Sequence, residues 1–262
     1  MRKVYRKVNT HDYWNQRWGA FEADGTTFQN KNIYPIKYVD RIISKGKWTI
    51  DIGCGLGRVV KHYHNEGYKI SGCDYSEVAV EKLKKNSPEL DIIQANILSL
   101  PYEDKQFDNI LLLGVLHGIE KLDDINKALS ESVRCLKDDG HMIIANRADN
   151  WEHYLIDKIT DLKQGKGDSF HKVSFKKSEV EELAKSHGLR IDSIELITNV
   201  PFLHKFRLFR KTNKFDESIT RTHGFKLNLL GGLIYKCLKI CFPGKFGTSY
   251  VLTAQKGKSK NI

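Results

Sequence analysis

Short apolar runs alternate with amphipathic stretches along most of the chain. Runs rich in β-branched and aliphatic residues predict strands, which are 48–52, 68–73, 90–95, 107–113 and 141–145. Between them, apolar positions three and four residues apart, together with capping residues, predict helices such as 56–65 and 122–136. Strands that alternate with helices in this way favour an α/β fold with a doubly wound parallel sheet.

The two ends of the chain extend this core. Helices at 9–20 and about 34–44 precede the first strand, so we expect residues 1–47 to form a helical lid over the site. Near the other end, a helix at 178–187 and strands at 189–200 and 248–254 complete the pattern.

The interval between the last two strands is too long for a turn, so we expect an inserted element with structure of its own. The expected division is a core over 48–200, the insertion 201–247, the last strand 248–256 and a basic tail 257–262.

Charge changes this picture only near the C-terminal end. The chain holds 43 Lys and Arg against 32 Asp and Glu, a net charge of +11. Residues 1–200 hold 30 of each, and residues 201–262 hold 13 basic and 2 acidic residues, so 13 − 2 = +11. A localised excess indicates a surface that meets phosphate, or lysines that solvate an apolar helix pair; both interpretations stay open.

The five cysteines are odd in number and form no C-x-x-C pair, which favours free thiols in a reducing compartment and no metal site. The N-terminal stretch has no apolar run typical of a signal peptide, and no uninterrupted apolar segment reaches the ~18 residues of a spanning helix. We therefore expect a cytoplasmic protein.

The most informative stretch is the first strand and the glycines after it, Asp51-Ile52-Gly53-Cys54-Gly55-Leu56-Gly57. Strand, glycine turn and helix together predict a nucleotide site at the carboxyl end of a parallel strand. An acid before the first glycine would repel a pyrophosphate and suits a ligand with an ammonium group. Asp74 follows the second strand, where a carboxylate can accept hydrogen bonds from ribose hydroxyls.

The Asp-x-Gly-x-Gly-x-Gly string, with Asp74 after the second strand, resembles the motifs of the class I S-adenosylmethionine-dependent methyltransferases of the type 11, quinone-biosynthesis-like group. The resemblance implies a Rossmann-like seven-stranded sheet with an antiparallel last strand and S-adenosylmethionine as the cofactor. It covers 48–145 by motif and extends to 254 by the order of elements.

The resemblance also assigns residues to parts of the cofactor. Gly53 and Gly55 open the backbone, Asp51 orders the loop or a water network at the amino-acid end of the cofactor, and Asp74 holds the ribose. Asn96 stands where the family usually has an acid that binds the adenine amine, and an amide oxygen can still accept that hydrogen bond. The remaining expected cofactor contacts are Cys54, Tyr75, Ile97 and Gly114.

For the acceptor side, His117 is the candidate catalytic base, since its ordinary pKa of ~6.5 suits proton transfer near neutrality. The alternative is a hydrogen-bonded histidine that shapes the pocket. The other candidate acceptor or lid residues are Tyr13, Trp14, Arg17, His153 and Tyr154. Trp14 and Trp18, four apart, also fit a simple core stripe.

Three functions remain open. The first is O- or N-methylation of a small-molecule or lipid-linked metabolite, with 226–242 as an acceptor lid or a peripheral membrane contact. The second is RNA methylation, particularly of tRNA, with the basic segment on phosphates. The third is a non-catalytic subunit that keeps the cofactor pocket. The DNA amino-methylation strings Asn-Pro-Pro-Tyr and Asp-Pro-Pro-Tyr and the Pro-Cys pair of cytosine methylation do not follow the fourth strand.

Overall fold

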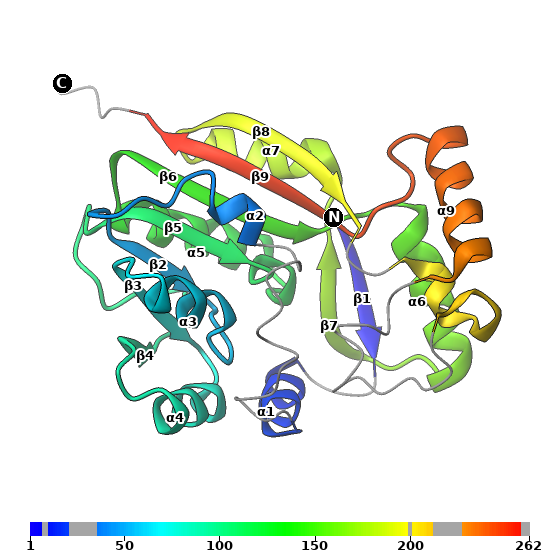
Figure 1. The fold of residues 1–262 in the computed structure, drawn as a ribbon, viewed down its shortest axis with the longest axis horizontal. Helices are drawn as coiled ribbons and strands as arrows, with labels where there is room; N and C mark the ends of the chain where they lie inside the picture. The colour runs from blue at the N-terminus through cyan, green and yellow to red at the C-terminus, as the bar shows by residue number, and fades with distance from the viewer. Residues whose placement is uncertain (7–9, 21–35, 199–200, 212–226, 258–262) are drawn as a thin grey trace.

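The computed structural model describes residues 1–6, 10–20, 36–198, 201–211 and 227–257. A seven-stranded sheet with strand order β4-β3-β2-β5-β6-β9-β8 forms its centre (Figure 1). Its strands are β2 (Thr49–Ile52), β3 (Ile70–Asp74), β4 (Ile92–Gln94), β5 (Phe107–Leu113), β6 (Leu136–Arg147), β8 (Leu189–Ile197) and β9 (Ser249–Lys256).

The register of the central strands explains their apolar sequences. In β5, Ile110 lies opposite Ile50 of β2 and Met142 of β6 in parallel ladders, and all three side chains are fully buried. A strand covered on both faces needs a continuous apolar run, and β5 has one from Ile110 to Leu113. β9 runs antiparallel between β6 and β8, with Leu252 opposite Ile144 on one side and Ile194 on the other. The predicted α/β class, seven strands and antiparallel last strand are confirmed.

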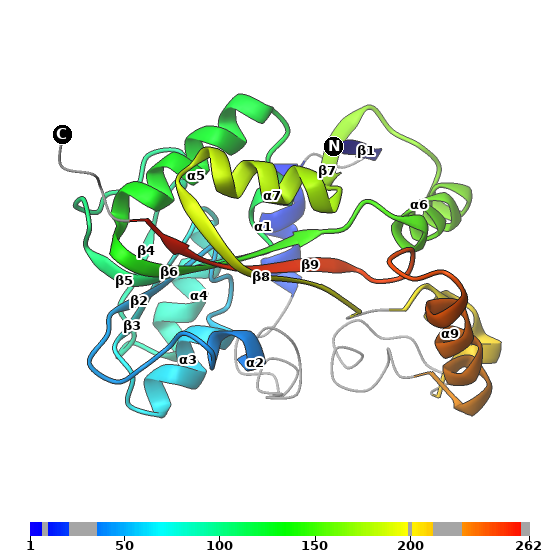
Figure 2. The same ribbon diagram turned by 90° about the horizontal axis from the view of Figure 1, so that it is seen from above.

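Helices cover both faces of the sheet, as Figure 2 shows from above. On one face, Ile110 and Leu112 pack in one core cluster with side chains of α5 (Leu122–Cys135) and α7 (Lys177–Ser186). On the other, Leu111 packs in a second cluster with helices α2 (Ile36–Val39), α3 (Arg58–Asn65) and α4 (Glu77–Asn86). Alternate residues of one strand therefore build two separate cores.

Two predicted helix boundaries differ from the structure. The helix expected at about 34–44 starts outside the described residues and is helical only over Ile36–Val39, before a turn. The helix expected at 178–187 begins earlier, because the Glu179 carboxylate accepts the backbone N–H of Lys176 and caps it there. Capping depends on backbone geometry that spacing alone does not define.

A second, two-stranded sheet was not predicted. β1 (Arg2–Arg6) pairs antiparallel with β7 (Ser169–Ser174), so the N-terminal segment is not purely helical as expected. The following helix, α1 (Thr10–Ala20), contacts both α4 and β7 (Figure 1). β1 is five residues long and its partner β7 is far away in sequence, so the residues around β1 do not indicate that it pairs.

The segments that precede β7 and β9 form a small satellite layer. They are α6 (Trp151–Gln164), the short 3₁₀ helices η3 (Phe202–Lys205) and η4 (Arg207–Phe209), and α9 (Leu229–Cys241). The fully buried Glu152 of α6 accepts hydrogen bonds from the Phe202 backbone N–H and the Tyr235 hydroxyl, at 2.7 and 2.5 Å. These bonds join α6, η3 and α9.

Residues 212–226 of the insertion and 258–262 of the tail lie outside the described residues. Within the described part of the chain, no helix is long and apolar enough to cross a membrane.

Candidate active site

A cavity of about 790 Å³ lies at the carboxyl ends of the parallel strands. Its walls come from the turns after β2, β3, β4 and β5, from the end of β6, and from α1, α6, β7 and η3. The structure brings ten sequence-predicted residues to this cavity: Asp51, Gly53, Cys54, Gly55, Asp74, Tyr75, Asn96, Ile97, Gly114 and His117. The predicted lid and acceptor residues Trp14, Arg17 and His153 also line it.

The glycine turn adopts a backbone that only glycine accommodates. Gly53 and Gly55 have φ of +78° and +56°, in the left-handed region. A Cβ on Gly53 would lie 2.4 Å from a methyl carbon of Val115. The backbone N–H groups of Gly53 and Cys54 both donate to the Cys73 carbonyl, at 2.7 and 3.0 Å, so the turn is fastened to the end of β3.

Asp74 holds the glycine turn and the start of α4 together. One carboxylate oxygen accepts the Gly55 N–H at 2.8 Å and the other accepts the Ser76 N–H at 2.9 Å. Burial raises the pKa of Asp74, while these N–H groups oppose that shift. A carboxylate offers about four acceptor positions, so Asp74 retains capacity for ligand hydroxyls.

Asp51 is the least satisfied polar group at this end of the cavity. Its side chain is buried, and its Oδ1 has no hydrogen-bond partner among the described residues. Burial, opposed by the charge of Arg58 and assisted by that of Asp74, raises the pKa of Asp51 to about 7. An ammonium group placed here would satisfy the orphaned oxygen and stabilise the carboxylate, which fits the amino-acid end of S-adenosylmethionine.

The residues expected at the adenine end of the cofactor line the same cavity as Asp51 and Asp74. The Asn96 side-chain oxygen accepts the backbone N–H of Leu98 at 2.9 Å, which fixes the amide in the turn after β4. That oxygen has a second lone pair, so it remains able to accept from an exocyclic amine. Tyr75 is 56% exposed, at the rim of the cavity.

α1 closes the cavity over the glycine turn. The indoles of Trp14 and Trp18 stack with centroids 5.8 Å apart, and a Cβ on Gly55 would come within 2.7 Å of the Trp18 ring. The Ser76 hydroxyl donates to Asn15 at 2.8 Å, which attaches α1 to the start of α4. Trp18 was not predicted as a site residue, although it lies one helical turn after Trp14 and therefore on the same face of α1.

The far end of the cavity is basic. His117 lies there with its Nδ1 unpartnered among the described residues, and its pKa lies well below the usual value because of burial and the charges of Lys172 and Arg147. Burial, together with the charges of Arg147 and Arg17, lowers the pKa of Lys172 to about 7. Arg147 and Lys172 were both missed by sequence reasoning.

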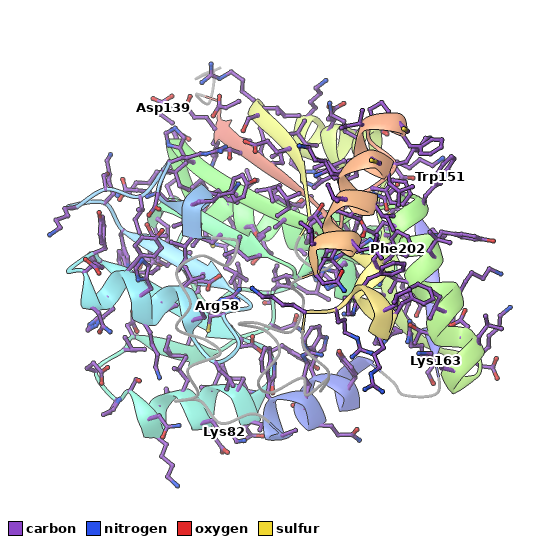
Figure 3. The ribbon with its side chains drawn as sticks, turned by 45° about the vertical axis from the view of Figure 1, so that its right-hand side comes forward. Arg58, Lys82, Asp139, Trp151, Lys163 and Phe202 are labelled. Carbon is purple, nitrogen blue, oxygen red and sulfur yellow. The ribbon has the colours of Figure 1, made fainter. Side chains whose placement is uncertain are left out.

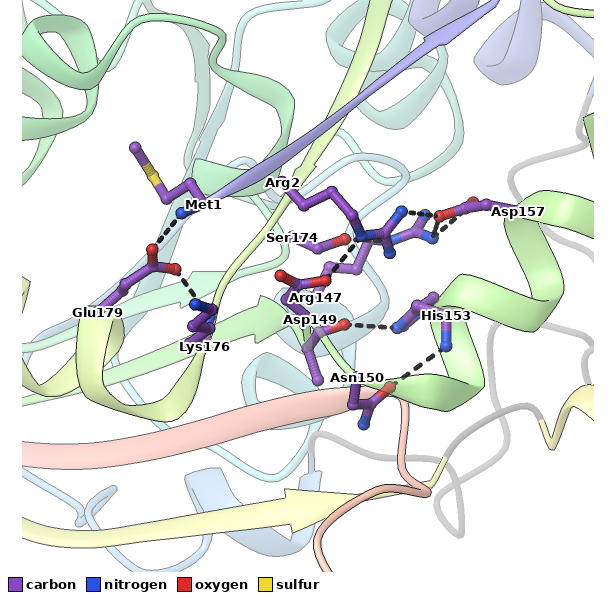
Figure 4. A network of polar contacts seen from close by, with 11 residues as sticks. Met1, Arg2, Arg147, Asp149, Asn150, His153, Asp157, Ser174, Lys176 and Glu179 are labelled. Atoms are coloured by element: carbon purple, nitrogen blue, oxygen red, sulfur yellow. Dashed lines mark hydrogen bonds and ion pairs between the residues drawn. The ribbon is translucent and has the colours of Figure 1, made fainter.

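A network of arginines supports this end (Figure 4). The Arg147 guanidinium donates to Ser174 at 2.8 Å and to both oxygens of Asp157 at 2.7 Å. Asp157 also accepts from Arg2 at 2.9 Å and from Arg6 at 3.4 Å. One buried carboxylate thus orients three arginines from β1 and β6.

Three of the predicted acceptor residues have other surroundings. His153 lines the cavity with its Nδ1 hydrogen-bonded to the Ala148 carbonyl at 2.9 Å, and burial lowers its pKa. Tyr13 lies behind the wall, edge-on to Trp14 and His171. Tyr154 is half exposed on α6 with Lys158 over its ring, so the structure does not bring it to the cavity.

Comparison with known proteins agrees with this geometry. The sequence profile of the family described as "Methyltransferase domain" matches residues 50–144. The ubiquinone/menaquinone biosynthesis C-methyltransferase of Rickettsia akari is 26% identical, over 80% of this chain and 83% of that protein. "Probable tRNA methyltransferase 9B" of Mus musculus is 32% identical, over 38% of this chain and 21% of that protein.

Solved structures share the fold. A methyltransferase of Methanosarcina mazei aligns with a TM-score of 0.61 over 87% of this chain and 99% of its own, at 17% identity. The chain spans about half or less of the length of the first curated relatives it matches. The glycine turn, the orphaned Asp51 oxygen and the Asp74 bridge fit S-adenosylmethionine as the family's cofactor. Residues 50–144 therefore match a methyltransferase domain in sequence, and the chain shares its fold with solved S-adenosylmethionine-dependent methyltransferases.

Proposed function

We propose that the chain transfers a methyl group from S-adenosylmethionine to an oxygen or nitrogen of a small-molecule or lipid-linked metabolite. One observation carries the proposal: the same cavity that holds Asp51 and Asp74 continues, under α1, to His117, Lys172 and His204. Small-molecule sites enclose ~300–1,000 Å³, which matches a cavity of about 790 Å³. The second half of the cavity is therefore assigned to the acceptor.

Bound S-adenosylmethionine supplies a methyl group that its sulfonium charge already activates. The residues of this chain bind and align the two reactants and exclude water. His117 is neutral near pH 7, because burial and nearby cations lower its pKa, and its open Nδ1 can accept a hydrogen bond from an acceptor O–H or N–H. We assign it to positioning the acceptor hydrogen at that nitrogen.

A transfer assay tests this proposal. The protein is incubated with methyl-labelled cofactor and with separate RNA, lipid and low-molecular-mass fractions of the cell that makes it. We expect label in the low-molecular-mass or lipid fraction, and none in RNA. Label in RNA that ribonuclease treatment removes would contradict the proposal and establish the nucleic-acid alternative, whose binding should also weaken steeply from about 50 to about 200 mM salt.

The surface of α9 favours a lipid-linked acceptor over a free one. Leu229, Leu233 and Ile240 recur on one face of this helix and are 83%, 55% and 68% exposed. Phe242, directly after α9, contacts Trp151 of α6 at a ring-centroid distance of 5.2 Å, and Figure 3 labels Trp151 beside α9. Residues 227–247 contain lysines and no acidic residue. An apolar face flanked by lysines suits an anionic bilayer surface.

Vesicle binding tests this surface. We expect the protein to co-sediment with phosphatidylserine-containing vesicles and to lose most of that binding when Leu229, Leu233 and Ile240 are replaced by serine. Each large aliphatic side chain contributes ~1.5–3 kcal/mol when buried, so the triple variant should bind at least about 100-fold more weakly. Leu162→Ser, which removes an 86% exposed leucine of α6, is the matched control. Equal sedimentation of the triple variant and the wild type would exclude this contact.

A further inference from the structure

The acceptor end of the cavity has an uneven distribution of charge. Its two lining carboxylates, Asp51 and Asp74, both belong to the glycine-turn end. The lining residues from β6, β7, α6 and η3 include Arg147, Lys172 and Lys205 and, in the described part of the chain, no acid. One end of the cavity therefore suits an ammonium group and the other suits an anion.

Lys172 is the cation that most needs a partner. Among the described residues, none forms an ion pair with it, and its ammonium lies over the rings of Tyr13 and Trp14, 5.6 and 5.5 Å from their centroids. Arg17 lies over the same two rings, at 5.6 and 6.0 Å. A partly buried cation that forms no ion pair is unfavourable, and aromatic faces compensate only part of that penalty.

Arg147 adds a second fixed charge at this end. Its side chain is 11% exposed and is held by Ser174 and Asp157, so it cannot swing toward solvent without breaking those bonds. Asp157 is shared by three arginines and does not neutralise Arg147 alone. Its guanidinium is thus prepositioned, and a planar guanidinium matches carboxylate and phosphate geometry.

We propose that the methyl acceptor carries an oxyanion, a carboxylate or a phosphate, that binds between Lys172, Arg147 and Arg17. This inference rests on the proposed function, because it assigns a substrate class to the same cavity. The oxyanion satisfies Lys172 and orients the acceptor, while His117 contacts the hydrogen to be replaced. His117 and Lys172 line the same cavity, so one small molecule can contact both.

Small aromatic anions test the proposal directly. Calorimetry on protein saturated with S-adenosylhomocysteine compares benzoate and phenyl phosphate with the neutral isostere benzamide. We expect at least one anion to bind about tenfold or more tighter than benzamide, the gain of a charge-assisted hydrogen bond. The two anions distinguish a carboxylate site from a phosphate site. Equal binding of both anions and benzamide would overturn the proposal.

Variants locate the effect. Lys172→Met should reduce the preference for the anion to about threefold or less, by removing the unpaired charge while keeping the length of the side chain. Lys158→Met is the matched control, because Lys158 is exposed on α6 outside the cavity lining, and it should keep the full preference. An unchanged preference in Lys172→Met would overturn the assignment. Unchanged S-adenosylhomocysteine affinity in both variants confirms that they are folded.

The preference should also depend on pH. Lys172 is a cation below its lowered pKa of about 7, so benzoate affinity should fall as the pH rises from about 6 to about 9. Bound benzoate raises that pKa, which shifts the fall to higher pH than in the free protein. The groups that act on Lys172 or share its surroundings are Arg6, Arg17, His117, Arg147, His153, Asp157 and His171.

The proposal and the proposed function fail separately. If S-adenosylhomocysteine binds but no anion is preferred, the oxyanion site is wrong and the methyltransferase function stands. If S-adenosylhomocysteine does not bind at millimolar concentration, the proposed function itself is wrong.

Discussion

Replacing Asp74 by alanine is expected to weaken S-adenosylhomocysteine binding by about 100-fold or more, since charge-assisted hydrogen bonds contribute ~1.5–3 kcal/mol each. The substitution removes the group expected to hold the ribose and also frees the N–H groups of Gly55 and Ser76. The glycine turn and the start of α4 would then lose their common anchor. Isothermal titration calorimetry at neutral pH measures the change.

Two further variants make the Asp74 result specific. Asp74→Asn keeps an acceptor oxygen and should bind with intermediate affinity. Asp108→Ala is the control. The Asp108 carboxylate accepts hydrogen bonds from the Trp48 backbone N–H and from Lys137, at the ends of the strands opposite the cavity. Like Asp74→Ala, this variant removes a carboxylate that binds a backbone N–H, but it does not alter the cavity lining. It should bind S-adenosylhomocysteine like the wild type. Wild-type affinity in Asp74→Ala would contradict the placement of the cofactor.

Replacing Asp157 by asparagine is expected to lower the free energy of unfolding by roughly 3–5 kcal/mol, the usual effect of breaking a buried ion pair. Asp157 is 4% exposed and pairs with Arg2, Arg6 and Arg147, so its loss leaves three cations without their shared counter-ion. For a chain of this size the melting temperature should fall by about 10 °C. Differential scanning calorimetry measures the melting temperature, and urea unfolding measures the free energy of unfolding.

The control is Asp161→Asn, one turn further along α6, where no ion pair is formed with another described residue. It should change the melting temperature by no more than about 2 °C. The double variant Arg147→Met with Asp157→Leu should recover part of the loss, because it removes both partners of the closest pair. A wild-type melting temperature in Asp157→Asn would show that the arginine cluster does not depend on this carboxylate.

The sequence predicted most reliably those features that depend only on neighbouring residues, such as a turn or a buried strand. The acid and three glycines at 51–57 predicted a turn that the backbone angles of Gly53 and Gly55 require. The apolar run 110–113 within the predicted strand 107–113 indicated a central strand, because a strand covered on both faces favours apolar residues on both sides. These two features predicted the centre of the sheet and the cofactor end of the cavity.

The acceptor end was not predictable in the same way. Arg147 comes two residues after a predicted strand, so its place at the sheet's carboxyl edge was available from the pattern and was overlooked. Lys172 carried no signal, since it lies on β7, whose partner β1 is more than 160 residues away. Tyr154 was predicted for its residue type, and only helix geometry shows that it faces outward. Residues brought together by distant pairing escape an analysis of neighbouring positions.

The position of β9 has a consequence for synthesis on the ribosome. β9 lies between β6 and β8, so in the described sheet β8 has no hydrogen-bonded partner until β9 has been made. Until then the nascent chain exposes the unpaired edges of β6 and β8, and unpaired strand edges promote aggregation. Shielding by a chaperone at this late stage would therefore govern the yield of native protein.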